Sequence, residues 1–63
     1  MKNNIETSRK TKNISQEYLA NFLEVSRQTI NAIENAKYCP SLALAFKIAK
    51  FFELPIEKIF LYE

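Results

Sequence analysis

The 63-residue chain contains no glycine, no histidine and no tryptophan, and it has one cysteine, Cys39. Without glycine it cannot form a glycine-rich phosphate-binding loop. Without histidine, a serine or cysteine nucleophile lacks its usual base, and one cysteine cannot complete an ordinary zinc site. The sequence therefore predicts no enzyme activity, no metal and no cofactor, and Cys39 is interpreted as a plain loop thiol without a redox role.

Long apolar runs are also lacking. Charged residues interrupt every apolar stretch before it is long enough to cross a bilayer. The first six residues do not form the apolar core of a signal peptide, and the lone cysteine cannot form an internal disulfide. We expect a soluble, cytoplasmic protein without a membrane partner.

The residues that are present suit a small core. The chain is 48% hydrophobic and 13% aromatic, which is enough for one domain over residues 1–63. The net charge is only +2, but residues 1–12 hold four cations against one anion, a net of +3. This basic segment is compatible with contacts to phosphate groups and equally with a solvated helix face, and charge alone does not choose between them.

Three serines mark the starts of helices. Ser15, Ser26 and Ser41 each precede an apolar-periodic run, and a serine hydroxyl accepts a hydrogen bond from an amide in the first helical turn. The pattern predicts an all-α fold with helices over residues 5–12, 16–23, 27–35, 42–52 and 56–59. In the fourth helix one inward stripe is expected, formed by Leu42, Ala45, Ile48, Ala49 and Phe52.

Residues 60–63 are ambiguous. Their aromatic and alternating character favours an extended strand over a longer fifth helix. Such a strand could pair with residues 1–4 and cover an otherwise bare edge. A short two-stranded pairing of the chain ends is therefore an alternative to an entirely helical fold.

The second and third predicted helices carry the functional signal. Only Glu24 and Val25 separate the second helix from the serine that opens the third. The third helix is rich in side chains that can hydrogen-bond base edges and phosphates: Arg27, Gln28, Thr29, Asn31 and Asn35. Arginine can donate two parallel hydrogen bonds to guanine, and glutamine can pair with adenine in the same way. Two short helices with this composition describe a helix-turn-helix that reads DNA.

The order of these residues extends over nearly the whole chain. The strings are Ile14-Ser15-Gln16, Val25-Ser26-Arg27-Gln28-Thr29-Ile30, Ile33-Glu34-Asn35, Lys37-Tyr38 and Pro40-Ser41-Leu42. In this order the sequence resembles the phage repressor and Cro-type, or Xre, helix-turn-helix family. The resemblance implies a five-helix, lambda-repressor-like domain that binds double-stranded DNA.

The resemblance also implies a role for individual positions. Expected base contacts are Arg27, Gln28, Thr29 and Asn31. Expected contacts to the DNA backbone are Gln16, Ser26, Asn35, Lys37 and Tyr38, although Tyr38 could instead pack on its loop. Arg9 and Glu34 match an ion pair that ties the first helix to the third.

Four positions depart from the family pattern. Asn13, Glu24 and Ala36 stand where members usually have a glycine in a left-handed turn, and Ser8 replaces a large apolar core residue. Asparagine tolerates the left-handed conformation, whereas glutamate and alanine each cost about 1 kcal/mol there. We therefore expect a slightly weakened domain whose first helix has a thin apolar face.

Surplus apolar residues near the carboxyl end point to a contact surface. The expected interface consists of Leu44, Ile56, Phe60 and Tyr62. The resemblance implies a two-fold dimer on a palindromic operator, and we therefore expect a homodimer that regulates transcription, most simply as a repressor. The alternative is a protein-interaction module, such as an antitoxin or adaptor, whose main partner is a different protein chain.

Overall fold

The computed structural model describes residues 1–61, which form five helices and two short strands. Their order is β1 (Lys2–Asn3), α1 (Ile5–Thr11), α2 (Gln16–Leu23), α3 (Arg27–Glu34), α4 (Leu42–Phe52), α5 (Ile56–Ile59) and β2 (Phe60–Leu61). The predicted bounds of α2, α4 and α5 are confirmed, and α1 and α3 each end one residue earlier than predicted.

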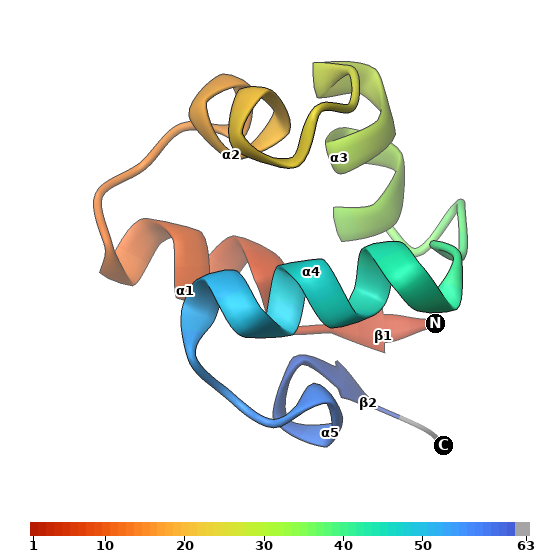
Figure 1. Ribbon diagram of the computed structural model, residues 1–63. Helices are drawn as coiled ribbons and strands as arrows, with labels where there is room; N and C mark the ends of the chain where they lie inside the picture. The colour runs from red at the N-terminus through yellow and green to blue at the C-terminus, as the bar shows by residue number, and fades with distance from the viewer. Residues whose placement is uncertain (62–63) are drawn as a thin grey trace.

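The helices are arranged around the two that cross the middle of the molecule, α1 and α4 (Figure 1). In this view α2 and α3 lie above them, and α5 and β2 lie below. The two strands bring the chain ends together as an antiparallel pair, with Lys2 opposite Leu61 and Asn3 opposite Phe60. The predicted pairing of the ends is confirmed there, and its continuation into residues 62 and 63 lies outside the described residues.

The three predicted serine caps are present. Each hydroxyl accepts a hydrogen bond from the backbone amide three residues later, at 3.0 Å for Ser15 and 3.1 Å for Ser26 and Ser41. Each cap satisfies one amide that has no partner inside the helix. The caps fix where α2, α3 and α4 begin.

The core draws on every helix. Its fully buried large side chains are Ile5, Leu19, Ile30, Ile33, Ile48 and Ile59. In α1 only Ile5 and Arg9 are buried, which matches the thin apolar face expected from Ser8. The core thus attaches α1 to the rest of the domain through one isoleucine and one charged side chain.

The prediction that Leu42 faces inward is wrong. Its side chain is 68% exposed, while the other four residues of the predicted stripe in α4 are buried. Leu42 is the first residue of α4. Side chains on a helix tilt toward its amino terminus, so the side chain of Leu42 extends beyond the end of α4, away from the core.

A left-handed residue follows each of the first four helices, at or just after the helix end. Asn13, Glu24 and Ala36 have φ angles of 59°, 60° and 59°, at the three positions where the family usually has glycine. Glu53, which ends α4, has a φ of 57° and was not anticipated. The chain therefore makes these left-handed turns without glycine, at a cost in stability at Glu24, Ala36 and Glu53.

Replacing the strained residues should stabilise the domain. Glu24→Gly and Ala36→Gly should each raise the free energy of unfolding by about 1 kcal/mol, because glycine adopts this conformation without a Cβ clash. Asn13→Gly is the matched control and should gain less, since asparagine already tolerates the left-handed region. Thermal melts measure the stability of all three variants. A loss of stability in Glu24→Gly and Ala36→Gly would contradict the claim that the left-handed conformation strains Glu24 and Ala36.

Candidate nucleic-acid interface

A tight turn joins α2 to α3. The Glu24 amide donates to the Asn21 carbonyl at 3.2 Å, and the Val25 amide donates to the Ala20 carbonyl at 3.0 Å. Val25 then packs, half-buried, against the core. These contacts close the end of α2 and hold α3 at a fixed angle to it.

The exposed face of α3 presents its polar side chains together. Arg27, Gln28 and Asn31 are exposed, and with Gln16 from the start of α2 they line one surface hollow. Three of the four predicted base-contacting residues therefore lie on one face beside a predicted backbone-contacting residue. An arginine and two carboxamides in this arrangement can donate and accept hydrogen bonds at base edges.

Thr29, the fourth predicted base-contacting residue, is tied to the helix cap. Its hydroxyl lies 2.9 Å from the Ser26 hydroxyl, and its amide donates to the same oxygen. Thr29 is half-buried whereas Ser26 is exposed. The pair stiffens the amino-terminal turn of α3, the end where free amides and the helix dipole favour a phosphate.

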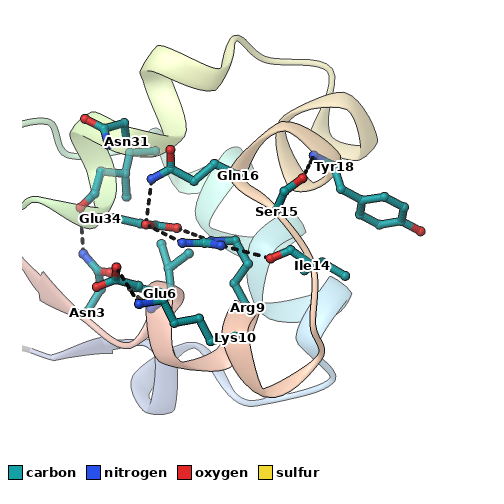
Figure 2. A network of polar contacts seen from close by, with 12 residues as sticks. Asn3, Glu6, Arg9, Lys10, Ile14, Ser15, Gln16, Tyr18, Asn31 and Glu34 are labelled. Carbon is teal, nitrogen blue, oxygen red and sulfur yellow. Dashed lines mark hydrogen bonds and ion pairs between the residues drawn. The ribbon is translucent and has the colours of Figure 1, made fainter.

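A buried ion pair holds α3 on α1. Arg9 donates from Nε to Glu34 Oε2 at 2.9 Å and from Nη2 to Glu34 Oε1 at 3.3 Å. The Arg9 residue is only 8% exposed, and its Nη1 donates to the Ile14 carbonyl at 2.9 Å. The ion pair expected from the resemblance is confirmed, and one guanidinium joins α1, α3 and the loop before α2 (Figure 2).

Gln16 belongs to the same network. Its Nε2 donates to Glu34 Oε1 at 3.0 Å, so α2 is also fastened to the last residue of α3 (Figure 2). The sequence did not reveal this bond, because the two residues are 18 positions apart and no local spacing connects them. The bond aligns the Gln16 side chain with the α3 surface and leaves its Oε1 and second N–H free for another partner.

The predicted phosphate-contacting residues after α3 lie on the surface. Asn35, Lys37 and Tyr38 are all exposed. The Asn35 side chain donates to Asn31 Oδ1 at 3.2 Å. This bond links a residue predicted to contact the DNA backbone with one predicted to contact a base. The Lys37 amide donates to the Ala32 carbonyl at 2.9 Å and closes the helix.

The predicted dimer residues that the structure describes, Leu44, Ile56 and Phe60, are all half-buried. A second hollow, which we call the apolar face, is lined by Met1, Cys39, Pro40, Leu42, Ala45, Ile56 and Phe60. Two predicted interface residues, Ile56 and Phe60, therefore line this face, and both also pack half-buried against the core, as Leu44 does. Tyr62 lies outside the described residues. Leu42 is the most exposed apolar residue of the face, and sequence reasoning missed it by placing it inward.

Within residues 1–61 no helix is long and apolar enough to span a membrane. In the same part of the chain no three histidine, cysteine or acidic side chains come together as they would around a metal ion.

Two consecutive capped helices with a tight turn, the second carrying an exposed polar face, define a helix-turn-helix domain. The family model described as Helix-turn-helix matches residues 5–59, and the chain belongs to this family, in its Xre-type form.

Similar proteins share the full length of the chain. An uncharacterized HTH-type transcriptional regulator of Methanocaldococcus jannaschii is 62% identical over 63 residues, which are all of this chain and 96% of that protein. Regulators of the same description from Archaeoglobus fulgidus and Bacillus subtilis are each 44% identical over 63 residues. Those matches cover 89% and 96% of the two proteins.

Proposed function

We propose that this protein is a transcriptional regulator that binds a palindromic operator in double-stranded DNA as a homodimer and acts as a repressor. The observation that carries the proposal is the shared polar face of Arg27, Gln28, Asn31 and Gln16, presented by a capped helix. The names of the similar proteins, all HTH-type transcriptional regulators, support the same assignment.

In this proposal the amino-terminal half of α3 enters the major groove. Arg27 and Gln28 are in its first turn, where side chains of a recognition helix reach base edges, and Asn31 follows one turn later. Arg27 fits a guanine and Gln28 an adenine through paired hydrogen bonds. Thr29, bonded to the cap, contributes through its methyl group or its hydroxyl.

The DNA backbone contacts flank this face. Gln16 and Ser26 stand at the starts of α2 and α3, and Asn35, Lys37 and Tyr38 follow the end of α3. Contacts to phosphates on both sides of the recognition helix set its register along the groove without reading sequence. Lys37 adds the charge that makes the binding sensitive to salt.

The homodimer is proposed because one recognition helix reads too few base pairs to select a site among many competitors. A two-fold dimer places two such helices on half-sites about 34–36 Å apart. The apolar face supplies a contact surface, since Leu42 projects from it with 68% exposure and apolar groups gain free energy when water is removed. Repression needs only that the bound dimer occlude a promoter.

Selection of bound sequences from a random duplex pool tests the proposal. The purified protein should enrich a two-fold symmetric sequence, and its affinity should fall steeply with salt because phosphate contacts release counterions. Placing the enriched site over a promoter should then block transcription in a purified system. Failure to enrich any duplex sequence, with a stable complex formed instead with a different protein chain, would favour the interaction-module alternative.

A further inference from the structure

The Asn3 side chain connects the paired chain ends to α3. Asn3 lies in β1 opposite Phe60, and its Nδ2 donates to the Ile33 carbonyl in α3 at 2.8 Å. The same nitrogen lies 3.2 Å from the Met1 carbonyl, and Asn3 Oδ1 accepts from the Ile5 amide at 3.2 Å. Figure 2 shows Asn3 beneath α3, with a dashed line rising to that helix.

The carbonyl that Asn3 contacts is in the last turn of α3. Carbonyls at a helix end lack partners within the helix, and Ile33 O accepts only one amide from the following loop, that of Ala36 at 3.0 Å. The side-chain amide of Asn3 supplies a second donor to the Ile33 carbonyl. Ile33 itself is 1% exposed, so the bond is made at a rigid part of α3, next to Glu34 and its buried ion pair.

The other end of the connection is the apolar face. Met1 and Phe60 line that face. The Met1 carbonyl accepts from the Asn3 side chain, and Phe60 is the residue opposite Asn3 in the strand pair. A side chain held between these residues and α3 therefore relates the orientation of the apolar face to that of the recognition helix.

We propose that Asn3 is a positioning residue that sets the angle between the apolar face and α3, and thereby the half-site spacing that the dimer accepts. The inference rests on the proposed function as a homodimer on DNA. A rotation of about 5° at this link, over roughly 17 Å from the two-fold axis to each half-site, moves α3 by about 1.5 Å. Such a shift lengthens or breaks hydrogen bonds to bases.

The test separates the donor of Asn3 from its acceptor. Asn3→Asp removes the N–H donor to Ile33 and keeps an oxygen for the Ile5 amide. Asn4→Asp is the matched control, because Asn4 Nδ2 donates to the Lys58 carbonyl at 3.0 Å and so joins the same chain end to α5 only. Both variants add one negative charge at neighbouring positions.

Affinities are measured on operators whose half-sites are moved one base pair closer or farther apart, and dimerisation is followed by sedimentation. Asn3→Asp should bind the parental spacing about three- to tenfold more weakly and discriminate less between spacings. Its dimerisation and its base preference within a half-site should be unchanged. Asn4→Asp should keep the spacing preference of the parent.

A spacing preference in Asn3→Asp equal to that of Asn4→Asp would overturn the proposal. If Asn3→Asp does not fold, Asn3→Ser decides, because serine can accept from the Ile5 amide and is too short to reach Ile33. An unchanged spacing preference in Asn3→Ser would overturn the proposal equally. A parent protein that selects no two-fold site contradicts the homodimer itself, and the inference fails with it.

Discussion

Glu34→Ala should destabilise the domain by about 3–5 kcal/mol, because it leaves the buried Arg9 guanidinium without its carboxylate. It also removes the acceptor of the Gln16 side chain. A domain of this size has little stability to spare, so we expect the variant to be largely unfolded at 25 °C. Circular dichroism during urea and thermal unfolding measures the loss.

Two variants test whether the effect comes from an uncompensated charge. Glu6→Ala removes the exposed partner of Lys10, a pair 3.3 Å apart whose side chains are 59% and 68% exposed, and should cost about 0.5 kcal/mol or less. The double variant Arg9→Met with Glu34→Leu removes both buried charges and should be more stable than Glu34→Ala alone. A Glu34→Ala variant as stable as Glu6→Ala would contradict the packing of α1 on α3.

Leu42→Asp should convert the dimer to monomers and weaken operator binding about 100-fold or more, because the two half-sites are then no longer bound by one linked pair of helices. A dimer would bury this aspartate without a partner. The monomer should keep its fold, since Leu42 is 68% exposed and a negative charge in the first turn of α4 interacts favourably with the helix dipole.

Phe22→Asp is the matched control. Phe22 is also a large exposed apolar residue, at 61%, but it lines a different hollow with Phe51 and the lysines of α4. This variant should remain dimeric. Sedimentation at micromolar concentration distinguishes the two variants, and a Leu42→Asp protein that remains dimeric with full operator affinity would place the interface elsewhere.

Local signals predicted most of the fold. The three serine caps located the starts of α2, α3 and α4, and the apolar periodicity gave α2 and α4 their observed ends. Both signals lie within a few residues of the feature that they predict, so they can be recognised without the tertiary structure. Leu42 shows the limit, because periodicity placed it on the inward stripe and could not show that the helix begins at the edge of the core.

The sequence proposed the residues of the candidate site, but not the hydrogen bonds that hold them in place. The composition of α3 pointed to Arg27, Gln28 and Asn31, and the resemblance supplied the pair of Arg9 and Glu34. The bonds from Gln16 to Glu34 and from Asn3 to Ile33 span 18 and 30 positions. Such contacts depend on how helices pack, which no local pattern in one sequence records.

We propose that the amino-terminal turn of α3 reads bases, and the duplex selection repeated with Arg27→Ala and with Gln28→Ala tests this role most directly. Each variant should fold, lose preference at one or two base pairs in each half-site, and bind the parental site more weakly by about 1–3 kcal/mol. Enrichment of the parental sequence by both variants, with parental affinity, would contradict this role.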